Sequence, residues 1–148
     1  MNTSSDLPPD NDHRRPDDAD DATVEAAGKL SEALEWVERA RGHLYSFHQL
    51  IGRADFLAEE AAQQLEAAGH TDLARQARQD VVGRNVLHGR WTFQIVEDFD
   101  DGYWEPFRAF DRTVRDQLLG GKRHVYEAEM KEQRRTRGLP RHESRPDE

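Results

Sequence analysis

The sequence contains no cysteine among its 148 residues. Disulfides, thiol nucleophiles and cysteine-based zinc or iron–sulfur sites are therefore excluded. It also has no long apolar run, and none follows the basic pair Arg14 and Arg15. The sequence therefore predicts neither a signal peptide nor a membrane-spanning segment, and a cytoplasmic location is expected. Glycine-rich nucleotide loops and serine–histidine–acid arrangements are missing as well, so no catalytic residue is predicted.

Positive charge is scarce overall, because the formal net charge is −9 at pH 7. Such a balance disfavours non-specific binding to nucleic acid or to an anionic membrane. Toward the C-terminus, between residues 122 and 145, basic residues outnumber acidic ones, but interspersed glutamates dilute that stretch. Nucleic-acid binding is therefore not the expected function.

Large apolar side chains are almost absent from both ends of the chain. Residues 1–22 hold seven aspartates and three prolines, which predicts a disordered acidic tail because too little apolar surface can be buried to offset the entropy of ordering. Residues 138–148 have a similar composition and are also expected to be disordered. The expected folded part is a helical domain over residues 23–137.

What the sequence does contain is helical periodicity. Between Ala22 and Ala68 apolar residues recur at steps of three and four, which predicts one long helix. The residues that carry this pattern are Leu30, Leu34, Val37, Leu44, Ile51, Ala58, Ala62 and Leu65. Gly69 is placed to end the helix in a left-handed conformation. A break near Gly42 is an alternative, since a glycine weakens a helix by roughly 1 kcal/mol relative to alanine.

Further helices are expected over residues 71–86, 90–119 and 122–137. In the middle one, an apolar step of three or four runs from Val96 to Leu118, and Gly102 and Pro106 should bend it. A strand-like alternation from Trp91 to Ile95 before the turn signal Asp101–Gly102 leaves a hairpin over residues 91–105 as the alternative. The predicted fold class is all-α, a three- or four-helix bundle built on the long first helix.

Polar residues interrupt the apolar face of the long helix. Arg41, His48 and Asp55 share the seven-residue register of Leu34 and Ala62. Burying polar groups is unfavourable unless they are paired, so partners are expected across the bundle. The candidates are Glu97, Asp98, Asp101, Arg84 and Arg90. We interpret these residues as a hydrogen-bond network, and expect His48 to be largely buried and bonded to an acidic or backbone partner between Arg84 and Asp101.

An alternative interpretation is a site for a divalent metal or a small anion inside the bundle. Its ligands would be His48, Asp55, Glu59, Glu97 and Asp101, because carboxylates one helical turn apart suit hard cations. The helical di-iron pattern of Glu-x-x-His on two helices is missing. A separate anion site could use Arg84, Asn85 and Arg90, although the two arginines have acidic residues nearby to pair with.

Aromatic residues are concentrated near the middle of the chain, where seven of the twelve lie between Gly83 and Phe110. Since tryptophan and tyrosine anchor interfaces, Trp91, Tyr103 and Trp104 are candidates for a partner surface. Self-association into a homodimer is one form that this could take.

The run GRNVLHGRWTFQ over residues 83–94, followed by residues 97–103, resembles a motif of a family of small, uncharacterised helical proteins from high-GC actinobacteria. The resemblance implies a bacterial, cytoplasmic protein of mainly helical fold and no site residue. Taken together, the sequence predicts a non-catalytic interaction or regulatory domain, with the metal or anion site as the alternative.

Overall fold

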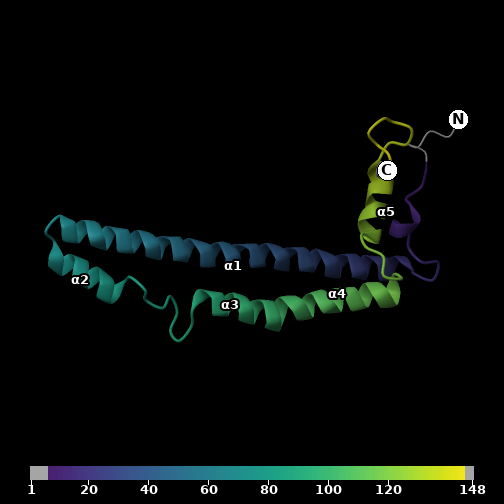
Figure 1. The fold of residues 1–148 in the computed structure, drawn as a ribbon. Coiled ribbons are helices and arrows are strands. Elements are labelled where there is room, and N and C mark those ends of the chain that lie inside the picture. Colours follow the sequence, from purple (N-terminus) through teal and green to yellow (C-terminus); the bar gives the residue numbers. More distant parts are fainter. Residues whose placement is uncertain (1–6, 146–148) are drawn as a thin grey trace. The chain divides into compact units, whose positions relative to one another are not determined.

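The computed structural model of the chain describes residues 7–145, and this part is all-α, as predicted (Figure 1). No strand occurs in it, and the only ladder-like pairing found there is an isolated bridge between Leu87 and Arg90. The elements are η2 (Asn11–His13), α1 (Asp21–Ala67), α2 (Thr71–Asp80), α3 (Thr92–Phe99), η3 (Asp100–Trp104), α4 (Glu105–Leu118) and α5 (Val125–Arg134).

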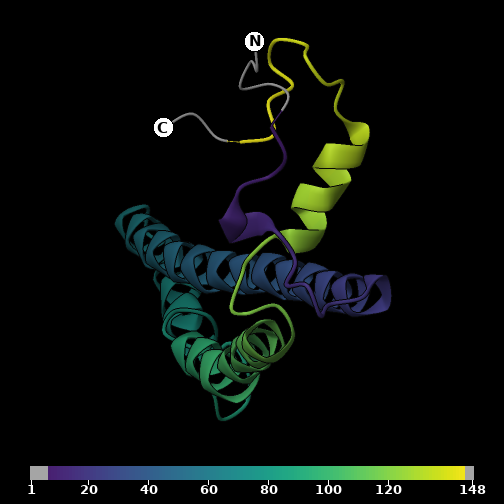
Figure 2. The ribbon, with the colours of Figure 1, turned by 90° about the vertical axis from the view of Figure 1, so that its right-hand side faces the viewer.

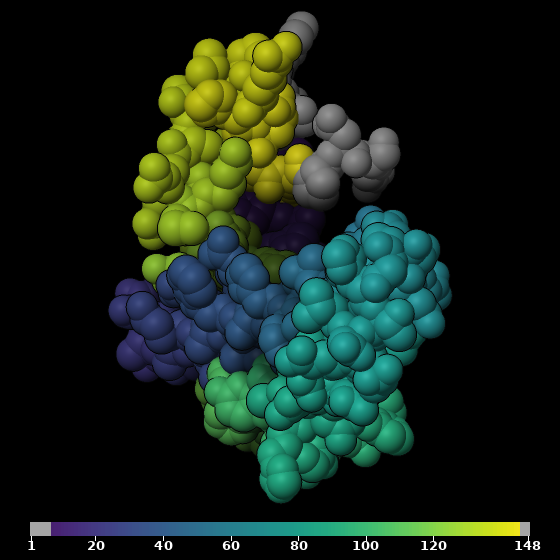
Figure 3. Space-filling model, turned by 90° about the vertical axis from the view of Figure 1, so that its left-hand side faces the viewer, coloured from purple at the N-terminus to yellow at the C-terminus, as the bar shows by residue number. Residues whose placement is uncertain are grey.

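The chain divides into two compact units. Unit 1 comprises Met1–Trp36 and Pro106–Glu148, and unit 2 comprises Val37–Glu105. Helix α1 contributes its first turns to unit 1 and the remainder to unit 2. In unit 2, α2 and α3 return along α1 in the opposite direction (Figure 1). The last turns of α1 are in direct contact with α2, where Arg78 donates to Glu66 at 2.9 Å, and this end of unit 2 is teal in Figure 3.

Helix α1 is continuous over 47 residues, so the alternative of a break near Gly42 is wrong. It begins where the Asp20 carboxylate accepts a hydrogen bond from the backbone N–H of Thr23 at 2.8 Å, which satisfies one of the otherwise unpaired donors of the first turn. It ends just before Gly69, whose φ of +90° is the left-handed conformation expected there.

The other helix boundaries differ from the predicted ones. Helix α2 ends at Asp80 instead of continuing to residue 86, because Gly83 and Gly89 take positive φ angles and the chain between α2 and α3 forms a loop. The expected helix over residues 90–119 consists of α3, the π-helical turn η3 and α4, so the hairpin alternative is wrong. The last helix is also shorter than the predicted 122–137, because it starts only after His124, which has a φ of +57°.

Unit 1 has a small apolar core. It is formed by the start of α1, the residues just before it, the end of α4 and the start of α5. The core residues are Ala19, Val24, Ala27, Leu119 and Val125, with Val114 against them. A buried carboxylate lies beside it: Asp111, 4% exposed, accepts hydrogen bonds from the Ser31 hydroxyl at 2.8 Å and from the Arg115 guanidinium at 3.1 Å. The charge of Asp111 is therefore paired, as a buried carboxylate requires.

Parts of both predicted tails pack within unit 1. Residues 1–6 and 146–148 of the expected disordered segments lie outside the described residues. In Figure 2 the purple N-terminal segment lies beside α5. Arg15 donates to the Glu129 carboxylate at 2.7 Å, and the buried Arg135 donates to the carbonyl of Leu7 at 3.0 Å. These charge-assisted bonds give residues 7–22 contacts that their composition alone did not predict.

Gly28 and Gly42 give a matched pair of substitutions in one helix. A Cβ atom on Gly28 would lie 2.7 Å from Cγ and 2.8 Å from Cβ of Tyr126, atoms too close to the backbone to move aside easily. We expect Gly28→Ala to destabilise the fold by about 1–3 kcal/mol through overpacking. A Cβ on Gly42 meets nothing within 4 Å, so Gly42→Ala should stabilise α1 by about 0.5–1 kcal/mol. Urea unfolding followed by circular dichroism measures both, and equal effects of the two changes would contradict the close contact.

Candidate functional site

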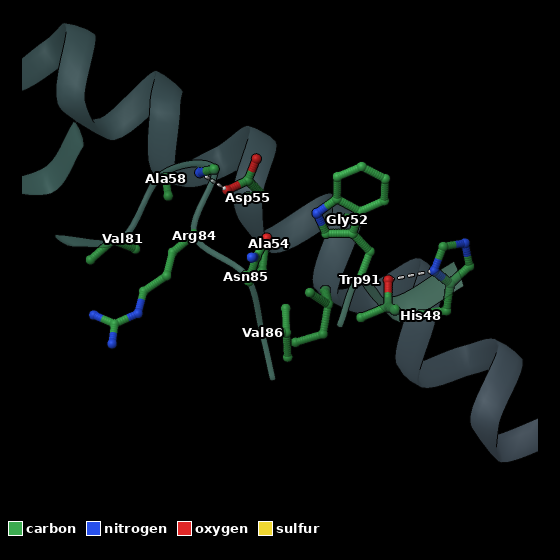
Figure 4. Close-up of a pocket in the computed structure, with 13 residues that line it drawn as sticks. His48, Gly52, Ala54, Asp55, Ala58, Val81, Arg84, Asn85, Val86 and Trp91 are labelled. Atoms are coloured by element: carbon green, nitrogen blue, oxygen red, sulfur yellow. Dashed lines mark hydrogen bonds between the residues drawn. The ribbon is translucent and has the colours of Figure 1, made fainter. Parts of the chain in front are cut away.

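An open groove of about 400 Å³ lies in unit 2 between α1 and the loop that joins α2 to α3 (Figure 4). Its apolar lining comes from Ile51, Ala54, Ala58, Val81, Val86 and Trp91. Its polar lining comes from His48, Asp55, Arg84, Asn85 and Thr92. The groove exists because α2 ends at Asp80 and α3 begins at Thr92, so that only a loop covers this part of α1.

Two hydrogen bonds fix the loop to α1 at either side of the groove. The backbone N–H of Gly83 donates to the Asp55 carboxylate at 2.7 Å. At the other side, Nδ1 of His48 and the hydroxyl of Thr92 share a hydrogen bond of 2.6 Å, drawn as a dashed line in Figure 4. Both ends of the loop are therefore held by polar side chains of α1.

A third bond of the same kind lies one heptad earlier, where Arg41 binds Asp100. Arg41, His48 and Asp55 are thus each bonded across unit 2, and we call these three side chains the polar ladder. The expectation that they have partners there is confirmed, but the partners are not the predicted Glu97, Asp98, Asp101, Arg84 or Arg90. They are Asp100, Thr92 and the backbone of Gly83. For each step of seven residues forward along α1, the partner residue has a lower residue number, as an antiparallel pairing requires.

The bond between Arg41 and Asp100 is the centre of a larger cluster. Arg41 binds both carboxylate oxygens of Asp100, from Nε at 2.7 Å and from Nη2 at 3.1 Å. The Tyr45 hydroxyl donates to the same carboxylate at 2.9 Å. The guanidinium of Arg41 lies 3.8 Å from the ring centroid of Trp104, whose indole N–H donates to Glu38 at 2.8 Å. A planar guanidinium suits this combination of a bidentate carboxylate and an aromatic face.

The cluster changes the acidity of its members. The hydrogen bond from Arg41 lowers the pKa of Asp100 below its ordinary value, because it favours the charged carboxylate. The hydrogen bond to Asp100 raises the pKa of Tyr45, since the carboxylate favours the protonated phenol, and burial acts in the same direction. Both side chains of the Arg41–Asp100 pair are only about one quarter exposed or less, so solvent screens the pair weakly.

His48 differs from its prediction in two ways. Its side chain is half-buried, whereas it was expected to be largely buried. Its partner Thr92 lies in the predicted segment but provides a hydroxyl, not a carboxylate or a backbone group. The imidazole borders the open groove, and this is why part of it stays accessible.

The residues proposed as metal ligands are engaged separately. Asp55 accepts the Gly83 N–H, Glu59 pairs with Arg78 at 3.4 Å, and Glu97 and Asp101 are exposed. Within residues 7–145, no three His, Asp or Glu side chains come close enough together to hold a metal ion. Among the described residues, the predicted ligands are therefore not gathered into one site.

The residues proposed for an anion are divided between two places. Arg84 and Asn85 line the groove, and the Arg84 guanidinium donates to the carbonyl of Asp80 at 3.3 Å. Arg90 pairs with Asp98 at 2.7 Å, and both of these side chains are more than half exposed. Arg90 is therefore paired with a nearby acidic residue, which was the alternative to an anion site.

The proposed partner surface is also divided. Trp91 and Tyr103 are each about half exposed, and Trp91 borders the groove. Trp104 instead lies in the Arg41 cluster and is half-buried. Sequence analysis missed the exposed apolar side chains of α1, Phe47, Leu50, Phe56 and Leu57. The sequence pattern that could have revealed them is the width of the apolar face of α1, which is greater than one neighbouring layer of helices can cover.

Comparisons with protein-family models, with curated proteins and with solved structures find no match for this chain. The resemblance to an actinobacterial family accordingly stays a prediction, and no function is transferred from a relative. Among the described residues, no helix combines the length and the apolar character needed to cross a bilayer.

Asp100 and Asp98 offer a matched test of the Arg41 cluster. We expect Asp100→Asn to destabilise the protein by about 1–3 kcal/mol at neutral pH, because the change removes the charge that Arg41 binds. Asp98→Asn should change stability by less than about 1 kcal/mol, since its pair with Arg90 is exposed. Chemical unfolding of the three proteins measures the difference.

The stability difference between the wild type and Asp100→Asn should also depend on pH. The folded state lowers the pKa of Asp100, so its stabilising effect is present above the ordinary value of 3.8 and is lost as the pH falls through the folded value. The stability difference between the wild type and Asp100→Asn should therefore shrink as the pH is lowered below 3.8. A difference that stays constant with pH would show that the ion pair is not its source.

Proposed function

We propose that the chain is a non-catalytic protein-interaction domain whose unit 2 receives a partner protein. The observation that carries the proposal is that the buried apolar residues of unit 2 are small, whereas several of its large apolar residues are exposed. The buried ones are Ala62, Ala74 and Val96, whereas Val81 and Trp91, which line the groove, are 57% and 53% exposed. Large exposed apolar surfaces of this kind mark interaction sites.

The groove has the features of an anchor site within that surface. Its volume of about 400 Å³ and its apolar walls fit one or two large apolar side chains of a partner. Trp91 lies at its edge, and aromatic residues at such positions contribute strongly to binding. Arg84 and Asn85 add polar groups at the rim, which favours a peptide with an acidic or carbonyl-rich flank.

The polar residues of the groove are better explained by structural roles than by catalysis. The Thr92 hydroxyl and the His48 imidazole form the only contact there that resembles a nucleophile and its base among the described residues. Thr92 is the first residue of α3, and this bond holds the start of that helix on α1. Asp55 likewise holds the loop through Gly83. These bonds give the groove a fixed shape, which lowers the entropy lost on binding.

Two neighbouring loop residues test the groove with one type of substitution. Val86 lines the groove and Leu87 does not, although both side chains are between 40% and 50% exposed. Peptides enriched from a random displayed library on the immobilised chain should carry a large apolar residue. Val86→Asp should weaken their binding by at least about tenfold, and Leu87→Asp should leave it nearly unchanged. Fluorescence anisotropy with a labelled peptide measures both affinities.

Circular dichroism of both variants controls for folding. Peptides that bind the two variants equally well, or the absence of any enriched peptide, would contradict the groove as a partner site. Blue-shifted tryptophan emission on binding, lost in Trp91→Leu, would place the peptide at the groove edge.

A further inference from the structure

A second, mainly apolar surface, which includes one histidine, runs along α1 on the part that belongs to unit 2. Its residues alternate in steps of three and four, the spacing of the core positions of a coiled coil. All seven are exposed in the single chain: Ala40, His43, Phe47, Leu50, Ala54, Leu57 and Ala61. We call this set the α1 seam. At 1.5 Å per residue it is about 32 Å long, enough for three heptads of helix packing.

The seam lies on a different part of α1 from the polar ladder. Each ladder residue follows a seam residue directly, as Arg41 follows Ala40 and His48 follows Phe47. Successive residues of an α-helix are separated by about 100°, so a helix that covers the ladder leaves the seam at its flank. Helices α2 and α3 and their loop bind the ladder side, which explains why Leu50 and Leu57 remain 65% and 50% exposed.

We propose that the α1 seam packs against the α1 seam of a second copy of this chain, with the two helices antiparallel. In this arrangement the seam residues from Ala40 to Leu57 pair with one another across the interface, and Ala61 lies beyond the last pair. Phe47 lies opposite the partner subunit's Leu50, Ala40 opposite the partner subunit's Leu57, and Ala54 opposite the partner subunit's His43. The outer layers thus pair a large residue with a small one, and the two central layers bring Phe47 and Leu50 together.

A parallel pairing of the two seams fits less well. In register, it would set Ala40, Ala54 and Ala61 each against itself, and Phe47 and Leu50 each against itself. Pairs of large side chains and pairs of alanines would then lie at different positions along the interface. His43 would also face His43 between the two helices. The antiparallel arrangement has no alanine–alanine layer and no His43–His43 contact, because residues 40 to 46 of one seam pair with residues 51 to 57 of the other.

Charged residues beside the seam select one antiparallel register. Arg39, Ser46, Arg53 and Glu60 recur every seven residues along its edge. The register described above places Arg39 opposite the partner subunit's Glu60, twice in a symmetric dimer. A shift by one heptad in one direction brings Arg39 against the partner subunit's Arg53, and a shift in the other brings Arg53 against itself. Like charges therefore oppose the two nearest alternatives.

The oligomeric state of the full chain tests the seam. Analytical ultracentrifugation should find a dimer in the wild type, and Leu50→Glu should raise its dissociation constant by at least about tenfold. Leu73→Glu is the matched control, because Leu73 of α2 is 54% exposed but lies outside the seam. A wild type that is monomeric at every concentration would overturn the proposal, as would a dimer equally sensitive to both variants. Unchanged circular dichroism of the variants excludes loss of fold as the cause.

Charge reversal tests the register. Arg39→Glu should weaken the dimer because it sets two acidic residues against each other, and the double variant Arg39→Glu with Glu60→Arg should restore it. A double variant that is no tighter than Arg39→Glu alone would overturn this register.

Disulfide trapping tests the orientation, and it is clean because the chain has no cysteine of its own. Under mild oxidation, a mixture of Ala40→Cys and Leu57→Cys chains should form mixed cross-linked dimers. Ala40→Cys alone should cross-link poorly, and efficient self-cross-linking would show a parallel dimer. The seam and the groove share Ala54, but Leu50 does not line the groove, so Leu50→Glu should leave peptide binding by the groove intact. A monomeric wild type that still binds groove peptides would overturn the dimer and support the proposed function.

Discussion

The polar ladder determines the arrangement of unit 2. Arg41, His48 and Asp55 occupy one stripe of α1, and each binds a group on the returning chain. Apolar side chains can slide by one helical turn at little cost, whereas three unlike polar pairs match in only one register. Leaving any of them unpaired would remove a charge-assisted or strong hydrogen bond. The ladder therefore fixes which part of the returning chain lies beside each turn of α1.

The ladder also explains why so little of unit 2 is a conventional core. Polar side chains take positions on the contact face that large apolar residues would otherwise fill, and the buried apolar residues of unit 2 are only the small Ala62, Ala74 and Val96. The loop between α2 and α3 is held by Asp55 and His48, not by packing of its own apolar residues. Val81 and Val86 consequently line an open groove. The apolar surface that remains exposed is thus a consequence of how the register is fixed.

The sequence was sufficient for the elements and insufficient for their partners. The apolar period predicted α1, and Gly69 predicted its end, because both depend on local backbone and side-chain preferences. The need for partners of Arg41, His48 and Asp55 followed from burial, but their identity depended on geometry. The π-helical turn Asp100–Trp104 adds a residue to one turn and presents Asp100 to Arg41, where Glu97, Asp98 and Asp101 had been expected. Nothing in the local sequence signals such a turn.

The periodicity of a helix likewise does not reveal which other segment packs against its apolar face. On α1 the apolar residues fill the seam and the adjoining line of Val37, Leu44, Ile51, Ala58 and Leu65, which together span more than one third of the helix surface. The returning chain is a single layer of helices, so it covers the side that carries the ladder. The ladder bonds hold this layer on the side of α1 that carries Arg41, His48 and Asp55, away from the seam. The apolar stripe that the returning chain leaves uncovered is the one that the proposed antiparallel pairing of two α1 helices would bury.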